Sequence, residues 1–180
     1  MDKRVERTRS TIRETLLSLM GEKPVERITT TELCREANIN RNTFYAHYGS
    51  PEDVLREVED ELVADVEQTL ARAYVTGDVT LELNRHVARH QELYRALWRC
   101  KSSQLMERAM DLVVGQSLGI WRQEGLAKLG EGELFLRFAA QGSLAVMERW
   151  LYDGCRMSPE DITNLINRFV VEGKQGLDPA

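Results

Sequence analysis

The sequence predicts an all-α protein of nine helices. Apolar residues recur at the 3.6-residue spacing of amphipathic helices, and helix-start signals precede several of these segments. No stretch reads as a convincing strand, and we find no sequence repeat or low-complexity tract. With 42% hydrophobic and 29% charged residues in 180, the chain can bury a real core and should be soluble.

The first predicted helix covers about residues 7–21. Its apolar residues return every three or four positions, as expected for a helix with one buried face. Pro24 interrupts the pattern before the next helix. The apolar residues of this first helix are Ile12, Leu16, Leu19 and Met20.

Residues 29–48, TTTELCREANINRNTFYAHY, predict two more short helices joined by a tight turn. Thr29 and Glu32 fit a capping box, in which each side chain accepts a hydrogen bond from an amide of the first turn. Residues 38–40, Asn-Ile-Asn, break this helix, and Asn40 is a good N-cap for the next one.

The third helix has two different faces. Phe44 and Tyr48 are one turn apart and are expected to point into a core. The outward face and its flanks carry hydrogen-bond donors and one cation. Two short helices joined in this way form the helix-turn-helix that enters a DNA major groove. The outward and flanking residues are Arg41, Asn42, Thr43, Tyr45, Ala46 and His47.

Six longer helices follow. Ser50 and Pro51 with two acidic residues are a strong helix-start signal, and Ser158 and Pro159 repeat it before the last helix. The predicted segments are residues 51–77, 79–90, 91–99, 102–125, 131–153 and a final helix from 159.

The net charge is divided unevenly along the chain. The total of −5 is unusual for a DNA-binding protein, whose binding domain is normally basic. Residues 1–50 hold nine Lys or Arg and seven Asp or Glu, a net charge of +2, whereas residues 51–180 have −7. We therefore predict a helix-turn-helix DNA-binding domain in residues 1–50 and a separate body domain in 51–180.

Several other classes are disfavoured. No apolar run approaches a membrane span and the N-terminus does not look like a signal peptide, so we expect a cytoplasmic protein. The cysteines at 34, 100 and 155 are widely spaced, which favours buried thiols over a disulfide framework or metal knuckle. We find no nucleophile elbow, phosphate loop or zinc-protease motif, and expect neither an enzyme nor a cofactor.

At residues 7–60 the sequence resembles the TetR (tetracycline repressor) family of transcriptional regulators. The similar features are the I-T-T entry to the second helix, the A-N-I-N turn and the T-F-Y-A-H-Y string. The resemblance implies a nine-helix TetR-like architecture, with a three-helix DNA-binding domain and a ligand-binding and dimerisation domain. It also implies a homodimer that binds a roughly palindromic DNA operator and releases it when a small-molecule effector is bound.

The resemblance implies roles for individual residues. Bases are read by the first residues of the third helix, here Arg41 and Asn42, whose side chains can pair with guanine and adenine respectively. Phosphates are held by the threonines that open the second helix and by three residues of the third. These phosphate positions are Thr29, Thr30, Thr43, Tyr45 and His47.

Two positions depart from the family pattern. Asn42 stands where relatives often have glycine or another small residue, so its base contact is our inference. Pro51 stands where relatives commonly have a lysine near a phosphate, which predicts modest phosphate affinity. Helix-start amides or the basic residues between 3 and 13 could compensate; a solvated, frayed N-terminus is the alternative for this basic segment.

The body offers a set of candidate effector-binding residues. His86 and His90, four apart, could form half of a metal site, but no partner at suitable spacing completes it, so we predict no metal site. A surface or pocket-lining pair is the alternative. The aromatic candidates are equally compatible with a plain core. The full candidate set is His86, His90, Tyr94, Arg95, Trp98, Trp121, Phe138 and Gln141.

Residues 139–145 are rich in small side chains, which allow close helix approach. With the final helix they predict a four-helix dimer interface made by residues 131–153 and 158–172, or alternatively an internal packing face. A competing function is a TetR-shaped co-regulator that acts through a protein partner and binds DNA weakly; the proline at 51 and the acidic body favour it.

Overall fold

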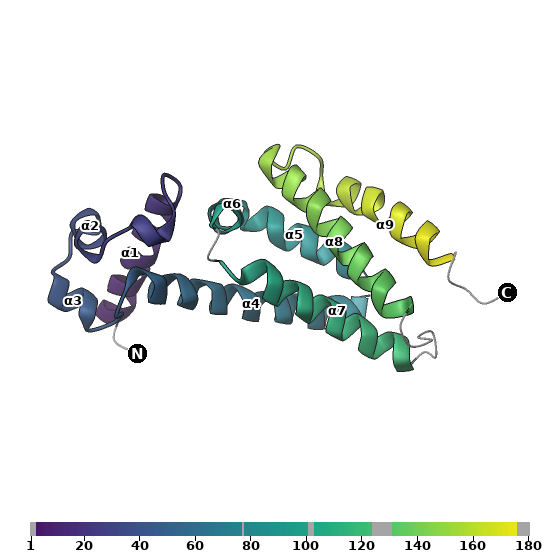
Figure 1. The fold of residues 1–180 in the computed structure, drawn as a ribbon, viewed down its shortest axis with the longest axis horizontal. Helices are drawn as coiled ribbons and strands as arrows, with labels where there is room; N and C mark the ends of the chain where they lie inside the picture. Colours follow the sequence, from purple (N-terminus) through teal and green to yellow (C-terminus); the bar gives the residue numbers. More distant parts are fainter. Residues whose placement is uncertain (1–2, 77, 101–102, 124–130, 176–180) are drawn as a thin grey trace. The chain divides into compact units, whose positions relative to one another are not determined.

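A computed structural model describes residues 3–76, 78–100, 103–123 and 131–175. The described residues form nine α-helices and one 3₁₀-helix, with no strand (Figure 1). The prediction of an all-α, nine-helix protein is therefore confirmed. The helices are α1 (Lys3–Met20), α2 (Thr30–Glu36), α3 (Arg41–Tyr45), α4 (Pro51–Thr76), α5 (Val79–Arg89), α6 (Gln91–Arg99), α7 (Leu105–Gln123), α8 (Glu131–Tyr152) and α9 (Pro159–Gln175), with the 3₁₀-helix η1 (Val25–Arg27) between α1 and α2.

The 3₁₀-helix η1 is the element that the sequence pattern did not predict. Pro24 precedes it with φ −66°, and Ile28 follows in an extended conformation. Val25 and Ile28 are both buried, so this short turn adds apolar side chains to the core between the first two helices.

The chain divides into two compact units. One contains residues 1–63 and 92–105, and the other contains 64–91 and 106–180. The division falls within α4, and α6 belongs to the first unit except for its first residue, Gln91. The predicted domain limit at residue 50 follows the helix-turn-helix, whereas the first compact unit also includes the start of α4.

The first unit places α1, η1, α2 and α3 around a common apolar core. Ile12, Leu16, Leu33 and Phe44 are fully buried in it, and so is Val54 from the start of α4. Burying a side chain as large as Phe44 contributes about 1.5–3 kcal/mol. This core holds α2 and α3 at a fixed angle to each other, as a helix-turn-helix requires.

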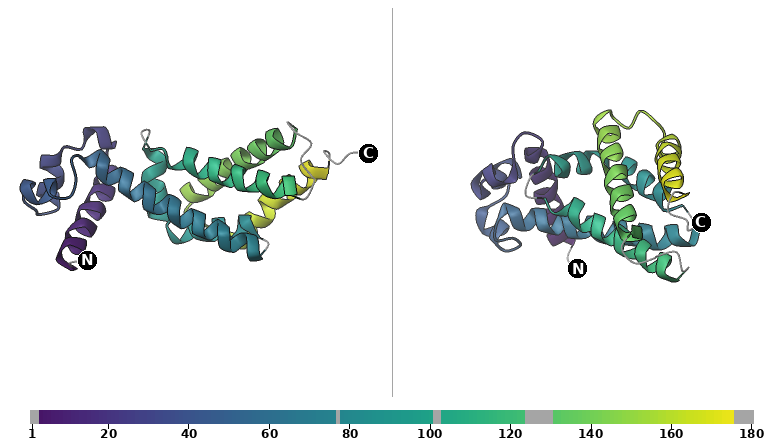
Figure 2. Two further views of the ribbon diagram at one scale, coloured as in Figure 1. Left: turned by 90° about the horizontal axis from the view of Figure 1, so that it is seen from below. Right: turned by 45° about the vertical axis from the view of Figure 1, so that its right-hand side comes forward.

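In the second unit α5 packs against α8 and α9, and α9 returns beside α8 (Figures 1 and 2). Trp150 near the end of α8 is buried, and its Nε1–H donates to the carbonyl of Met157 at 2.9 Å. This bond fixes the loop before α9. Ser158 caps α9 as predicted, accepting a hydrogen bond from the amide of Asp161 at 3.1 Å.

A buried polar contact joins α5 to α9. Asn84 is fully buried, and its Nδ2 donates to the hydroxyl of Thr163, 2% exposed, at 2.8 Å. The Thr163 hydroxyl in turn donates to the carbonyl of Pro159 at 2.6 Å. If α5 and α9 were aligned differently, the buried Asn84 amide would lose its hydrogen-bond partner at a cost in free energy. This pair therefore favours the observed alignment of the two helices.

Replacing Asn84 with alanine is expected to lower the free energy of unfolding by about 1–3 kcal/mol, because a buried hydrogen bond and packed volume are lost. Urea unfolding at one protein concentration measures the change. Asn164→Ala, on the exposed face of α9, is the matched control and should shift stability by about 0.5 kcal/mol at most. Equal effects of the two variants would contradict the role given to Asn84.

None of the described helices combines the length and apolar character needed to cross a membrane. All three cysteines lie in the described part of the chain and form no disulfide bond; Cys34 and Cys100 are buried, while Cys155 is half-buried.

Candidate nucleic-acid interface

The first turn of α2 is capped as the sequence predicts. The Thr29 hydroxyl accepts a hydrogen bond from the amide of Glu32 at 3.2 Å. The Glu32 carboxylate accepts from Lys23 Nζ at 2.6 Å, and this contact, assisted by the backbone amide of Thr29, lowers the pKa of Glu32. The Thr29 side chain thus caps α2, and Lys23 ties α2 to the segment that follows α1.

The turn between α2 and α3 depends on two asparagines. Asn38 adopts a left-handed conformation with φ 52°, which asparagine tolerates better than most residues. The Asn40 side chain accepts a hydrogen bond from the amide of Asn42 at 2.8 Å and begins α3. The predicted break and N-cap are confirmed.

The inner face of α3 anchors the helix. Phe44 is fully buried and Tyr48 is 5% exposed, as predicted. Tyr48 donates from its hydroxyl to Glu57 Oε1 of α4 at 2.8 Å, and the Arg9 guanidinium of α1 lies 5.7 Å from its ring centre. Burial, followed by the contact with Glu57, raises the pKa of Tyr48 to about 12. Contacts from α1 and α4 therefore hold Tyr48, at the end of the turn that follows α3.

The outer face of α3 is built around Arg41 and Tyr45. Arg41 donates to the Tyr45 hydroxyl at 3.3 Å, and its guanidinium carbon lies 5.8 Å from the ring centre. The hydrogen bond from Arg41, followed by one with Thr30 of α2, lowers the pKa of Tyr45. Thr30, Arg41 and Tyr45 thus form one cluster across α2 and α3.

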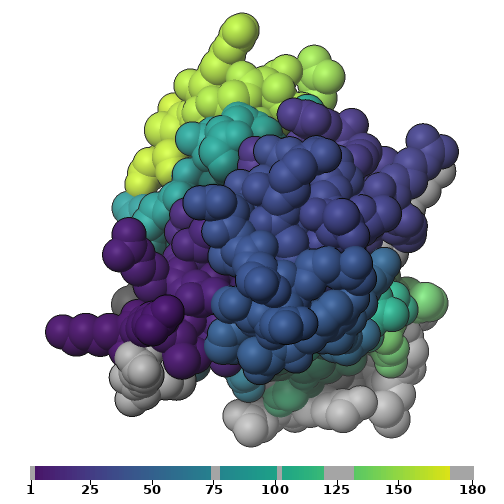
Figure 3. All heavy atoms as spheres, turned by 90° about the vertical axis from the view of Figure 1, so that its left-hand side faces the viewer, coloured from purple at the N-terminus to yellow at the C-terminus, as the bar shows by residue number. Residues whose placement is uncertain are grey.

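The remaining predicted DNA-contacting residues lie on the same two helices or at their ends. Thr29, Asn42 and Thr43 are exposed, and His47 is half-buried. Tyr45, already described in the cluster, is 50% exposed. Figure 3 shows α2 and α3 in blue on the face turned to the viewer, with the start of α1 in purple beside them. The surface offers a guanidinium, an amide, hydroxyls and an imidazole, all groups that bind phosphates or base edges.

Pro51 is buried at the first position of α4, where the family commonly has lysine. Ser50 caps the helix, its hydroxyl accepting from the amide of Asp53 at 3.2 Å. Proline suits this position because the N–H of a residue at the first position of a helix has no intrahelical acceptor, so its absence in proline removes no hydrogen bond. The site is therefore a well-formed helix start without a side-chain cation.

The basic N-terminal segment is the beginning of α1, and part of its charge is used within the unit. Arg9 pairs with Glu57, and Arg13 pairs with Glu57 at 3.4 Å and with Glu6 at 3.2 Å. The two contacts with Glu57 join α1 to α4, whereas the pair Arg13–Glu6 lies within α1. The side chains of Lys3, Arg4 and Arg7, in the same segment, are exposed.

The predicted effector-binding residues fall into both compact units. Tyr94, Arg95 and Trp98 are on α6, in the first unit; Tyr94 is buried and the other two are half-buried. The side chain of Trp121 lies outside the described residues. Phe138 and Gln141 are exposed on α8.

His86 and His90 are brought together with a third residue that the sequence did not indicate. His86 Nδ1 lies 3.5 Å and His90 Nε2 lies 3.7 Å from Oδ2 of Asp65, on α4. His86 is buried, which lowers its pKa to about 4, while the Asp65 carboxylate opposes that shift. No spacing rule links Asp65 to the two histidines, because they belong to different helices.

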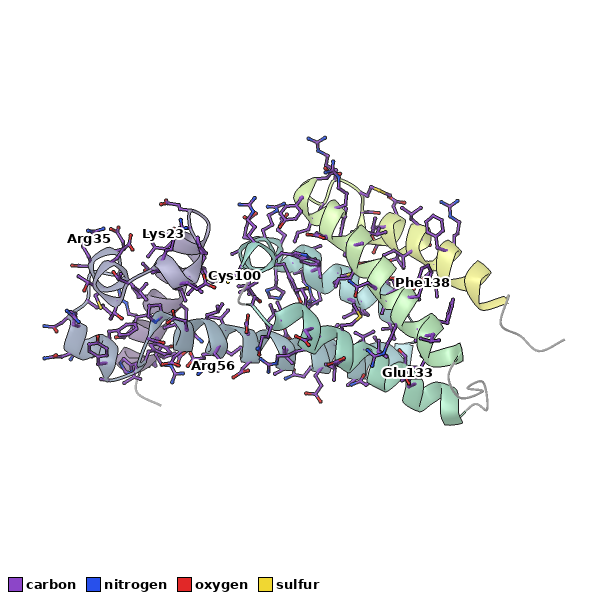
Figure 4. The ribbon with its side chains drawn as sticks, viewed as in Figure 1. Lys23, Arg35, Arg56, Cys100, Glu133 and Phe138 are labelled. Carbon is purple, nitrogen blue, oxygen red and sulfur yellow. The ribbon has the colours of Figure 1, made fainter. Side chains whose placement is uncertain are left out.

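Exposed apolar side chains gather on α8 and α9. Leu134, Phe138 and Phe169 are 70%, 76% and 67% exposed, and Phe138 is labelled in Figure 4. A groove of about 300 Å³ runs between the two helices, lined by Phe135, Phe138, Gly142, Val146, Ile166 and Phe169 among others. Patches of this kind commonly mark protein interfaces.

An all-α chain with a capped helix-turn-helix and a polar, cationic outer face on the second helix of that motif has the architecture of a DNA-binding transcriptional regulator. Residues 12–58 match the family model for bacterial regulatory proteins of the tetR family, and 76–172 match that for a transcriptional regulator C-terminal region. The chain belongs to the TetR family. Members are transcription factors rather than enzymes, and repression, homodimerisation and response to ligands are typical of them.

Individual relatives agree with this assignment. An uncharacterised helix-turn-helix regulator, YxbF of Bacillus subtilis, is 31% identical over 83 residues, covering 46% of this chain but 22% of that protein. A TetR regulator from Streptococcus agalactiae has a TM-score of 0.72 and 21% identity, covering 94% of this chain and 96% of its own. Thermus thermophilus FadR, a repressor solved in complex with lauroyl-CoA, has a TM-score of 0.57 and 20% identity. The match covers 92% of this chain and 94% of the FadR chain.

Proposed function

We propose that the chain is a homodimeric repressor that binds a roughly palindromic operator and releases it when a small molecule occupies the body. The observation that carries this proposal is the cluster of Thr30, Arg41 and Tyr45 on the outer face of the helix-turn-helix. Its hydrogen bonds position a cation on the helix that enters the major groove in this motif.

Arg41 and Asn42 are the proposed base readers. Both are exposed at the start of α3, the end of a recognition helix that contacts base edges. Stacking on Tyr45 holds the Arg41 guanidinium before DNA arrives, which reduces the conformational entropy lost on binding. Guanine is the favoured partner of arginine, and adenine that of asparagine.

Phosphate binding is proposed for Thr29, Thr30, Thr43, Tyr45 and His47, which donate from hydroxyl or imidazole groups around the base-reading positions. The amides at the start of α4 add donors beside the capping Ser50. Since Pro51 supplies no charge there, the exposed basic residues at the start of α1 are the proposed additional source of electrostatic attraction.

Dimerisation is proposed through α8 and α9, within residues 131–153 and 158–172. Phe138 and Phe169 are strongly exposed beside a groove of apolar and small side chains. A two-fold axis through this face would bury one copy of each side chain from each subunit, as in an isologous interface, where both subunits use the same patch. Two helix-turn-helix units per dimer then match two operator half-sites.

The effector is proposed to bind within the body. The FadR structure, which shares the fold, was solved with lauroyl-CoA, so the architecture can accommodate a long apolar ligand. For this chain we keep His86, His90, Tyr94, Arg95, Trp98, Trp121, Phe138 and Gln141 as candidate effector contacts, each to be tested singly. A cytoplasmic location is part of the same proposal, since the operator DNA is there.

A selection experiment tests the proposed function. The full-length protein is incubated with a library of random DNA duplexes, and bound duplexes are amplified and sequenced. We expect a palindromic consensus, and gel-shift affinity for it that falls linearly with salt on logarithmic axes. Failure to enrich any sequence without a second protein would favour the co-regulator, to which the proline at 51 and the acidic body point.

A further inference from the structure

We propose that Asp65, His86 and His90 form a binding site for one divalent transition-metal ion, of which Zn²⁺, Co²⁺ and Ni²⁺ are the expected class. One donor atom from each residue lies within 4.8 Å of the other two. All three residues belong to the second compact unit, so the site is complete within it. The proposal does not depend on the DNA-binding function.

The two histidines are placed by helix geometry. They are four residues apart at the end of α5, and residues at this spacing lie on the same face. Their ring centres are 4.8 Å apart with planes inclined by 40°. The amide of His90 donates to the carbonyl of His86 at 3.2 Å, so the backbone that carries both rings is ordered.

The distances from Asp65 to the two histidines suit a shared ion better than a direct hydrogen bond. Metal–ligand bonds of about 2.0–2.2 Å at near-tetrahedral angles place two ligand atoms roughly 3.3–3.6 Å apart. Asp65 Oδ2 is 3.5 Å from His86 Nδ1 and 3.7 Å from His90 Nε2. Strong hydrogen bonds between nitrogen and oxygen are shorter, at about 2.7–3.2 Å.

The surroundings also fit an open metal site. His86 is 1% exposed, whereas the side chains of His90 and Asp65 are 40% and 44% exposed. The ion can therefore enter from solvent and keep water at its remaining positions. Arg72 and Arg89 place positive charge near His86 and weaken the attraction for a cation, so we expect moderate affinity.

The donor set selects the kind of metal. Two imidazole nitrogens and one carboxylate favour Zn²⁺ and its neighbours in the first transition row. Mg²⁺ and Ca²⁺ prefer sites made of oxygen ligands. An ion here would link α4 to α5 and stabilise the second unit, because it binds the folded chain and not the unfolded one.

The test is direct metal binding to full-length protein, treated with chelator and kept reduced. Equilibrium dialysis against Zn²⁺ should give one ion per chain, unaffected by excess Mg²⁺, with a raised Tm. Co²⁺ should give the visible absorption bands of a low-symmetry site. The variants Asp65→Asn and His90→Gln, both at half-exposed positions, should weaken Zn²⁺ binding at least about tenfold, the loss typical even of outer-shell partners.

Three controls separate this site from other donors. Glu67→Gln removes an exposed carboxylate from the same helix, His47→Gln removes the histidine of the first unit, and Cys155→Ser removes the half-buried thiol. Each should bind Zn²⁺ like the unaltered protein. Absence of a stoichiometric ion, unchanged binding in Asp65→Asn and His90→Gln, or loss of binding in a control would overturn the proposal.

Discussion

Replacing Arg41 and Tyr45 together with alanine is expected to weaken binding to the selected operator at least about a hundredfold. A good bidentate contact between arginine and guanine contributes roughly tenfold or more in affinity, and a dimer makes it twice. Tyr45 adds the loss of a proposed phosphate contact and of the ring on which Arg41 stacks. Gel-shift titration at fixed salt measures the effect.

Both substituted side chains are exposed, so circular dichroism and Tm should remain close to those of the unaltered protein. Arg85→Ala, an exposed arginine on α5 paired with Glu82 and Glu160, is the matched control and should leave operator affinity unchanged. Single variants divide the roles: Arg41→Ala should reduce discrimination between operator and random DNA, whereas Tyr45→Ala should weaken both. Unchanged operator binding by the double variant would remove the proposed interface.

Replacing Phe138 with alanine is expected to raise the dissociation constant of the dimer by about a hundredfold or more. Burial of a phenylalanine contributes about 1.5–3 kcal/mol, and a two-fold interface contains the side chain twice. Adding Phe169→Ala should yield a monomer at micromolar concentration. Analytical ultracentrifugation over a range of concentrations gives the dissociation constant.

Operator affinity should fall with dimer stability, because each monomer presents one helix-turn-helix unit. Met157→Ala is the matched control: the side chain is also exposed, at 42%, but lies in the loop before α9 and outside the groove. It should remain a dimer. If the phenylalanine variants remain dimeric at low concentration, the interface lies elsewhere on the chain.

The helix-turn-helix could be predicted closely from the sequence because its determinants are local. Thr29 and Asn40 cap helices whose amides lie within three residues of them, and Asn38 tolerates the left-handed turn between the two helices. Phe44 and Tyr48 fall on one face through helical periodicity alone. The polar residues of α3 occupy the remaining helix positions, which point away from that core and form the outer face.

Contacts between distant parts of the chain could not be predicted in this way. The sequence showed Arg9 and Arg13 as parts of a basic segment, and the fold pairs both with Glu57. Neither periodicity nor capping carries information about which charges from two helices will meet. The same is true of Asn84 and Thr163, whose buried hydrogen bond joins α5 to α9.

The sequence by itself therefore determined that the protein is a nine-helix chain with a DNA-reading motif near its N-terminus, because capping and periodicity act over a few residues. Only the tertiary structure placed Asp65 beside His86 and His90, and gathered Phe138 and Phe169 around one exposed groove. Such clusters arise when helices far apart in sequence pack together, and their geometry depends on the whole core rather than on any single segment.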